Sequence, residues 1–200
     1  MYLYQSGTLE MYKTMDSRLL IERYSAPWAM LQLKDDSLVC VGQVPSVDRD
    51  DYDTEIEIYD IETGTVQQYI RQGSSTDRNT PAQILQLDDG RVVTHVNNIV
   101  SIWKLEDDSF YELVTTFVLY PKELSVNYIC ETSIAATSGD EIITATCLDR
   151  ISSNYFVRVW NSNTGECKSY ASLPELPTCL LMLSTGRLAI GSFDGVLRMA

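Results

Sequence analysis

Short apolar runs alternate with polar turns along most of this chain. Three segments align without a gap, residues 27–42, 81–96 and 177–192, and a more divergent copy occupies residues 133–147. Each of the three reads as a proline, an apolar run that ends in leucine, a polar turn and a second apolar run. Proline marks the start of a strand, and Asp, Gly and Ser favour tight turns. The pattern therefore predicts a β-hairpin that recurs about every 50 residues.

A third and a fourth strand are predicted after each hairpin. The third strands alternate with period two, as in EIEIYD (55–60), VSIWK (100–104), FVRVWN (156–161) and VLRM (196–199). Fourth strands follow a polar turn at residues 65–70, 110–117 and 166–172. No segment keeps a helical apolar stripe over three turns. Four antiparallel strands per repeat are typical of a propeller blade, so we predict an all-β fold, a β-propeller of four-stranded antiparallel blades.

The strand count, about eighteen, predicts about four and a half blades in a single domain that spans residues 1–200. We expect one partial blade at residues 1–24 and another at 177–200. Full blades are expected near residues 27–71, 81–118 and 125–172. The last blade would lack its outer strand and the first its innermost one, which would expose apolar faces and permit self-association through open blade edges.

Three arrangements would cover these open faces. We expect that the residues belong to a longer ring of about seven blades. Alternatively, the strand at residues 18–24 could complete the last blade and close a four-bladed ring. Two chains could also complete one ring together.

Two segments resemble the third-strand and turn signatures of WD-repeat propellers: VRVWNSNTGEC (157–167) and LAIGSFDGVLRM (188–199). Ser192 and Asp194 match the serine and turn-aspartate positions of that family. The terminal Trp-Asp pair is approximated only by Tyr59-Asp60, and the Gly-His dipeptide is missing. The resemblance implies a divergent WD-repeat-like β-propeller, or a neighbouring propeller family with similar blades. It also implies a face on which protein partners dock.

The end of each third strand carries a residue in a shared slot, namely Tyr59, Trp103, Trp160 and Met199. Trp103 and Trp160 are expected to pack between blades, where each could bury about 150–250 Å².

The net charge of −13 comes from 28 acidic and 15 basic residues. Such a field repels phosphate and anionic lipid and attracts basic partners, so we expect neither a nucleic acid nor a membrane partner. No apolar run approaches the roughly 18 residues of a membrane helix. Five cysteines lie in apolar, strand-like runs without a C-x-x-C pair. We interpret them as buried, reduced core thiols of an intracellular protein, cytoplasmic or nuclear, although two paired cysteines in a secreted domain are the alternative.

Signals of catalysis are weak. His95 is the single histidine and lies in a predicted strand, where a general base would still need a positioned partner. We expect it to be a satisfied or partly exposed strand histidine. Zinc-ligand spacing, a P-loop, G-x-G-x-x-G and G-x-S-x-G are all absent from the sequence. We therefore expect no enzyme, no metal and no cofactor.

The most unusual connection is QVPSVDRDDYDT (43–54), in which four aspartates surround one arginine: Asp48, Arg49, Asp50, Asp51 and Asp53. One hypothesis is a capture loop for a basic peptide, which would act through charge steering and carboxylate pairs. The alternative is a solvated loop whose charges only keep the protein dispersed. Calcium could use the same oxygens, but their spacing matches no EF-hand loop.

Two further candidates lie near blade boundaries. The segment RQGSSTDRNTP (71–81) places Arg71 and Arg78 among small polar residues, as a binding element or a plain linker. Trp28 follows Pro27 at the start of a blade, either as an anchor near the central channel or buried between blades.

The sequence therefore predicts a non-catalytic protein–protein interaction scaffold of WD-repeat type that binds a partner protein or peptide on the propeller face. The alternative is an enzyme or ligand-binding propeller whose channel site needs blades missing from this chain. The example of a ubiquitin-ligase substrate receptor rests on family analogy alone.

Overall fold

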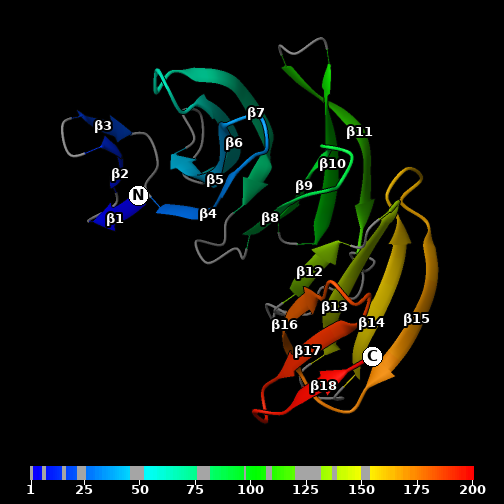
Figure 1. Cartoon of the computed structure of the whole chain (residues 1–200). Helices are drawn as coiled ribbons and strands as arrows, with labels where there is room; N and C mark the ends of the chain where they lie inside the picture. Colours follow the sequence, from blue (N-terminus) through cyan, green and yellow to red (C-terminus); the bar gives the residue numbers. More distant parts are fainter. Residues whose placement is uncertain are drawn as a thin grey trace. The chain divides into compact units, whose positions relative to one another are not determined.

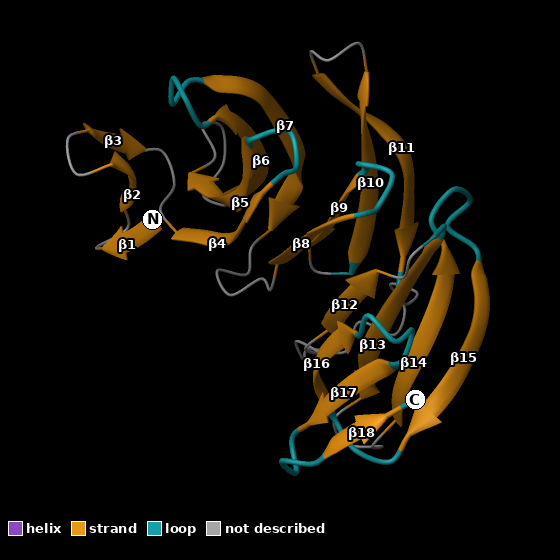
Figure 2. Ribbon diagram, viewed as in Figure 1, coloured by secondary structure: helices purple, strands orange, loops and turns teal. Residues whose placement is uncertain are grey.

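The computed structural model describes residues 2–5, 8–14, 17–21, 26–45, 52–75, 82–96, 98–106, 110–119, 132–136, 139–149 and 154–200. The chain divides into two compact units, residues 1–84 with 106–111 and residues 85–105 with 112–200. Every regular element in the described part is a strand (Figure 2). No helix there has the length and hydropathy to cross a bilayer.

The eighteen described strands form five antiparallel sheets in which consecutive strands are neighbours (Figure 1). The first sheet contains β1 (Tyr2–Gln5), β2 (Thr8–Thr14) and β3 (Ser17–Ile21). The second contains β4 (Ala26–Gln32), β5 (Ser37–Pro45), β6 (Tyr52–Asp60) and β7 (Val66–Ser75). The third contains β8 (Ala82–Gln86), β9 (Val92–Val96), β10 (Ile99–Glu106) and β11 (Phe110–Val118).

The fourth sheet contains β12 (Thr132–Ala136), β13 (Glu141–Asp149), β14 (Asn154–Asn161) and β15 (Cys167–Leu173). The last contains β16 (Pro177–Met182), β17 (Leu188–Ser192) and β18 (Leu197–Met199). The predicted all-β class is confirmed by these elements, and the described residues alone contain eighteen strands. Within the described residues, each predicted blade contains one sheet, and the predicted domain bounds stay a prediction.

The first hairpins of three sheets share one turn. A leucine N–H donates to the carbonyl of the residue after the turn: Leu33 to Ser37 at 2.8 Å, Leu87 to Arg91 at 2.8 Å and Leu183 to Arg187 at 2.9 Å. The third turn residue has a positive φ: 64° at Asp36, 91° at Gly90 and 78° at Gly186. Glycine and aspartate tolerate this region better than other residues do. The common turn aligns the three sheets residue by residue, as the repeat in the sequence predicts.

Within the second unit, the third and fourth sheets share an apolar core. Leu87, Val100 and Ile102 of the third sheet are at most 1% exposed, and they cluster with Trp160 of the fourth sheet. The ring of Phe117 stacks on Trp160, with centroids 4.8 Å apart and planes at 26°. Stacked aromatic pairs stabilise by about 0.5–1.5 kcal/mol beyond their buried area. The inter-blade role predicted for Trp160 is therefore confirmed.

The same tryptophan position carries a hydrogen bond inside each sheet. Trp103 Nε1 donates to Thr94 Oγ1 at 2.9 Å, and Trp160 Nε1 donates to Thr144 Oγ1 at 2.8 Å. Both tryptophans are under 10% exposed, and a buried indole N–H needs such an acceptor. Each pair ties the third strand of a sheet to its second strand.

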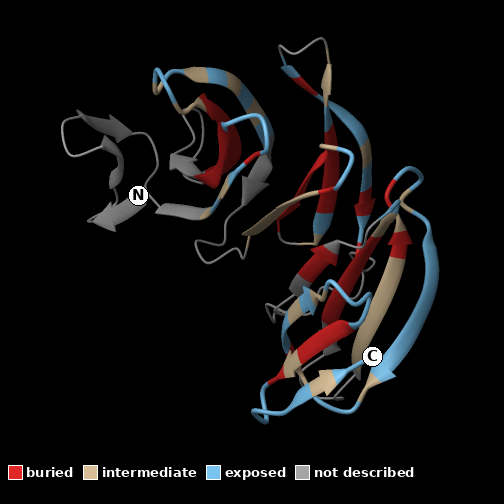
Figure 3. Ribbon diagram, viewed as in Figure 1, coloured by how far each residue is buried: buried red, intermediate tan, exposed pale blue. Residues whose placement is uncertain are grey.

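Side chains are more buried in the middle strands of a sheet than in its outer strand, as in β13 and β15 of the fourth sheet (Figure 3).

The fourth and fifth sheets share a second apolar cluster, in which Ala135 and Ile143 contact Leu188 and Ile190. Within the first unit, Gln68 and Tyr111 exchange two hydrogen bonds at 2.7 and 2.6 Å.

Two sequence expectations about the strands need correction. Strands β6 and β7 are longer than predicted, because Tyr52 and Asp53 pair with Ser75 and Ser74 although three of these four residues are polar. The residues at 71–75 are therefore strand rather than linker. His95 lies in β9 as predicted, and it is fully buried, which selects the first of the two expected alternatives, a satisfied strand histidine.

The second correction concerns the aromatic slot of the last sheet. Leu38, Val92 and Ile142 pair with Tyr59, Trp103 and Trp160. The equivalent Leu188 exchanges backbone hydrogen bonds with Ala200, so Ala200 and not Met199 occupies the slot. A shift by one residue reverses the face of a side chain. Met199 is therefore equivalent to Ile102, whose partner is Val93.

Candidate functional site

The predicted capture loop is only partly within the described residues. Asp48, Arg49, Asp50 and Asp51 lie outside them, and their role in binding stays a prediction. Asp53 lies inside β6, where its side chain is 5% exposed and its Oδ2 is 3.7 Å from Arg71 Nη1. Asp53 is therefore a buried strand residue rather than part of the connection.

The other two predicted candidates receive no side-chain description. The backbone of Trp28 belongs to β4, at a bulge between Pro27 and Ala29, but its side chain lies outside the described residues. Arg78 lies outside them altogether. Both assignments stay predictions.

Strand β6 carries a row of buried carboxylates that the structure brings together. Asp53, Glu55 and Glu57 alternate along one face of the strand, and each residue as a whole, backbone included, is at most 4% exposed. They face Val44, Gly42 and Cys40 of β5 in the register of the sheet. Buried carboxylates are stable only where charges or hydrogen bonds compensate their lost hydration.

Arg71 supplies one compensating charge from β7. Its Nη2 atom lies 3.3 Å from Glu55 Oε1, and its side chain remains 63% exposed. Arg71 therefore ties the outer strand to both Glu55 and Asp53, which fixes the end of β6 next to the acidic connection.

Tyr59 supplies a second compensating group. Its hydroxyl donates to Glu57 Oε2, and burial, followed by this bond to Glu57, raises the pKa of Tyr59 well above its usual value. Burial, with the Glu57 charge as the second cause, raises the pKa of the Cys40 thiol to about 12. Cys40 is consequently a protonated thiol at neutral pH and a poor nucleophile.

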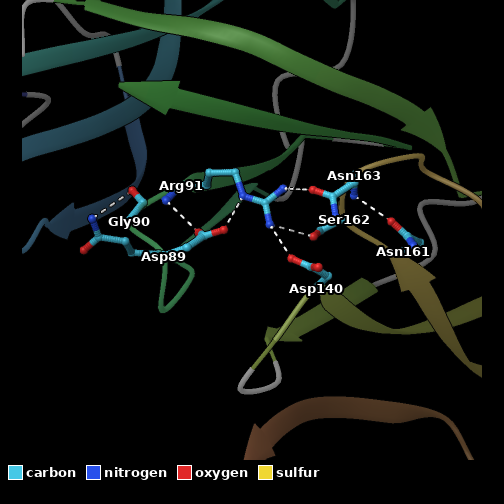
Figure 4. Close-up of polar contacts among 8 residues, drawn as sticks. Asp89, Gly90, Arg91, Asp140, Asn161, Ser162 and Asn163 are labelled. Atoms are coloured by element: carbon cyan, nitrogen blue, oxygen red, sulfur yellow. Dashed lines mark hydrogen bonds and ion pairs between the residues drawn. The ribbon is translucent and has the colours of Figure 1, made fainter. Parts of the chain in front are cut away.

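In the second unit, a network of side-chain hydrogen bonds and ion pairs surrounds Arg91 (Figure 4). The Arg91 side chain is 7% exposed, and its guanidinium uses all three of its nitrogens. Nε donates to Asp89 at 2.7 Å, Nη1 donates to Asn163 Oδ1 at 2.7 Å, and Nη2 lies 3.0 Å from Asp140 Oδ1. Nη2 also donates to Ser162 Oγ at 3.0 Å. We call this group the Arg91 clasp: Asp89, Arg91, Asp140, Ser162 and Asn163.

Local turn chemistry places these groups. Asp89 Oδ1 accepts the Arg91 N–H at 3.1 Å, so one carboxylate holds both the backbone and the side chain of Arg91. Asn161 Oδ1 accepts the N–H groups of Asn163 and Thr164 at 2.8 and 3.1 Å, an arrangement that folds the β14–β15 turn. Arginine suits this role because its planar fork can meet several acceptors at once. The clasp therefore fastens turns of the third sheet to turns of the fourth.

The WD-like turn of the last sheet has a similar but smaller arrangement. Arg198 donates to Ser192 Oγ at 2.7 Å and to Asp194 Oδ2 at 3.1 Å. The hydrogen bond from Arg198 is the main cause that holds the pKa of Asp194 below its usual range. Ser192 and Asp194 thus stabilise the β17–β18 turn.

Sequence reasoning missed both the Arg91 clasp and the buried row on β6. One signal was available for the clasp, since the aligned repeats place an arginine directly after the turn at 91 and again at 187. The period-two carboxylates of β6 were visible too, but an exposed strand face would look the same. Within the described part of the chain, no group of three or more His, Cys, Asp or Glu side chains could hold a metal ion.

No family model and no curated protein sequence matches the chain. The β-propeller domain of Cps50 (Swd1) from Myceliophteria thermophila matches with a TM-score of 0.61 and 11% identity, over 96% of this chain and 62% of that one. The computationally designed Ika4 protein matches with a TM-score of 0.55 and 15% identity, over 88% of this chain and 90% of that one. The designed Ika8 protein matches with a TM-score of 0.51 and 12% identity, over 97% and 65%.

These similarities show the fold alone. The predicted β-propeller class is confirmed by the sheets and by the match to the Cps50 domain. The chain spans 62% of the Cps50 domain and 65% of Ika8.

Proposed function

We propose that this protein is a non-catalytic interaction scaffold of divergent WD-repeat type that binds a basic protein or peptide on a face of its propeller. The fold, the WD-like segments at 157–167 and 188–199, and the net charge of −13 support this proposal. A field of this sign attracts basic partners and repels nucleic acid and anionic membranes.

The observation that carries the proposal is the burial of a histidine, a thiol, a tyrosine and an arginine among the described residues, although the thiols of Cys167 and Cys179 are exposed. His95 and Cys40 are fully buried inside sheets, Tyr59 is 2% exposed, and Arg91 is held in its clasp. These four buried side chains stabilise the blades, and a substrate in solution could not reach them. Surface charge then becomes the main means of recognition.

We place the binding element at the connection between β5 and β6, with Asp48, Arg49, Asp50 and Asp51 as the contact residues. Asp53 would support the contact residues rather than touch the partner. Its ion pair with Arg71 holds in place the end of β6 that joins the connection. Trp28 and Arg78 are proposed as neighbouring contacts. Carboxylates of this kind pair with arginine and lysine side chains of a partner.

The test is a binding titration with a fluorescent Lys/Arg-rich peptide, measured by anisotropy at low and at physiological salt. Asp50→Lys with Asp51→Lys should weaken binding roughly tenfold, since two attractive contacts become repulsive. Glu112→Lys with Glu175→Lys is the matched control, because it makes the same change in net charge at two exposed positions elsewhere. Equal weakening by both pairs would reduce the effect to net charge, and unchanged binding by the first pair would reject the acidic connection.

We also propose an intracellular location. Cys40 is a buried free thiol as expected, whereas Cys167 and Cys179 are free thiols that are exposed, so the expectation that they are core residues is wrong. Exposed free thiols suit a reducing compartment. Location of a tagged full-length protein by microscopy checks this, and a secreted product would contradict it.

A further inference from the structure

Within the second unit, the last sheet has one covered face and one open face. Leu188 and Ile190 of β17 point to the covered side, where they pack with Ala135 and Ile143 of the fourth sheet. The register places Leu181, Leu197 and Met199 on the opposite side, and these three side chains are 61%, 67% and 50% exposed. A contiguous open apolar face of this kind marks an interaction surface.

This open face is equivalent to a face that is covered elsewhere in the molecule. The shared turn aligns Leu183 with Leu87 and Arg187 with Arg91. The strand register then aligns Leu197 with Val100 and Met199 with Ile102. In the third sheet, Leu87, Val100 and Ile102 are buried against the fourth sheet, whereas Leu197 and Met199 are exposed.

Arg187 repeats the position of Arg91 but not its bonds. The turns match in their backbone hydrogen bond, 2.8 Å at Leu87 and 2.9 Å at Leu183, and both place a positive-φ glycine before the arginine. Arg91 is almost fully buried by acceptors of the following sheet. Arg187 is exposed, and among the described residues no hydrogen bond or ion pair reaches its guanidinium. Thr185 stands where Asp89 holds Arg91, so Arg187 has no carboxylate within its own turn.

We propose that the open face of β16–β18 is a docking surface for a further propeller blade that carries an aspartate in the turn before its second strand. That aspartate would meet Arg187 as Asp140 meets Arg91. Hydroxyl and amide side chains in the turn after the third strand of the blade would take the places of Ser162 and Asn163. Leu181, Leu197 and Met199 would pack against the apolar face of the blade. This inference is independent of the basic partner proposed above.

Two observations select this occupant. The first is continuity, because the third, fourth and fifth sheets form a series in which each covers a face of the one before. The second is charge, because an Arg91-like guanidinium needs a carboxylate to be buried. A second copy that presented the same open face would bring two Arg187 side chains together, and a basic peptide would be repelled in the same way.

The experiment extends the full chain after Ala200, through a Gly-Ser linker, with a second copy of residues 119–173. This added segment carries its own copies of Asp140, Ser162 and Asn163. Hydrogen exchange of the amides of β17 and β18 is then compared between the chain alone and the extended chain. We expect protection to rise at least about tenfold in the extended chain, as burial suppresses local opening.

Two variants separate docking from simple tethering. Arg187→Gln should abolish most of the added protection in the extended chain and leave the chain alone unchanged. Asp140→Asn with Ser162→Ala, made only in the added copy, should have the same effect. Equal protection with and without these changes would overturn the proposal, as would an added segment that gains no strand signal in circular dichroism. Protection of β18 in the chain alone that grows with protein concentration would also overturn it, because the occupant would then be a second copy.

Discussion

Nη2 of Arg91 lies 3.0 Å from Oδ1 of Asp140, so one charge pair joins a turn of the third sheet to a turn of the fourth. The arginine is 7% exposed and the aspartate 60% exposed. The guanidinium is therefore almost completely desolvated. The folded state tolerates this buried charge only because the acceptors around it form hydrogen bonds and ion pairs with it.

Removal of this guanidinium should destabilise the fold. Arg91→Gln is expected to lower the free energy of unfolding by about 2–3 kcal/mol, because the charge-assisted hydrogen bonds of a buried arginine are lost and the buried Ser162 hydroxyl loses a charged donor. Arg187→Gln is the matched control at the equivalent turn position, and it should change stability by less than about 0.5 kcal/mol. Urea denaturation followed by tryptophan fluorescence checks both values. Equal effects of the two variants would contradict the role given to the Arg91 clasp.

Gly165 tests the contact between a turn and the core. Its φ is 71°, and a Cβ added there would lie 3.0 Å from Phe117 Cβ. Gly186 has a similar φ of 78° but no atom within 4 Å of such a Cβ. Gly186→Ala should therefore cost about 1 kcal/mol of backbone strain, and Gly165→Ala about 1–3 kcal/mol more. Thermal unfolding measures the difference, and equal shifts of the two variants would show that Phe117 does not press on this turn.

The two Trp–Thr hydrogen bonds should contribute separately. Thr94→Val and Thr144→Val each leave a buried indole N–H without its acceptor, which should cost about 1–3 kcal/mol. The two sites lie in different sheets, so the double variant should equal the sum within about 0.5 kcal/mol. Denaturation of the three variants gives the comparison. If the double variant lost no more unfolding free energy than either single variant, the two hydrogen bonds would not be independent.

The sequence predicted the strands well because the hydrophobic period is a local signal. The hairpin of Leu87 to Arg91 and its copies could be placed from proline, leucine and turn residues alone. Polar strand ends such as Asp53 and Ser74 carry no such signal, because pairing of the backbone and not burial of apolar atoms holds them in the sheet. The Arg91 clasp could not be predicted in full, since Asp140 and Asn163 are distant in sequence and only packing brings them to Arg91.

Cys40 should make stability sensitive to alkaline pH. Burial and the Glu57 charge raise the pKa of its thiol from 9.0 to about 12, so the folded state keeps a proton that the unfolded state loses. This contribution to stability is complete below pH 9 and falls as pH rises from 9 to about 12, by up to about 1.4 kcal/mol per pH unit. Cys40→Ala should flatten this part of the pH profile of unfolding free energy. A profile that stays equally steep would contradict the assignment.

The central claim is that, within the second unit, the third and fourth sheets pack on one another as propeller blades, with Phe117 and Trp160 at the contact. A double-mutant cycle of Phe117→Leu and Trp160→Phe measures it most directly, because the hydrogen bond of Trp160 to Thr144 cancels in the coupling term. We predict a coupling free energy of about 0.5–1.5 kcal/mol between the two positions. A coupling of zero, with each variant still folded, would contradict the packing of the third sheet on the fourth.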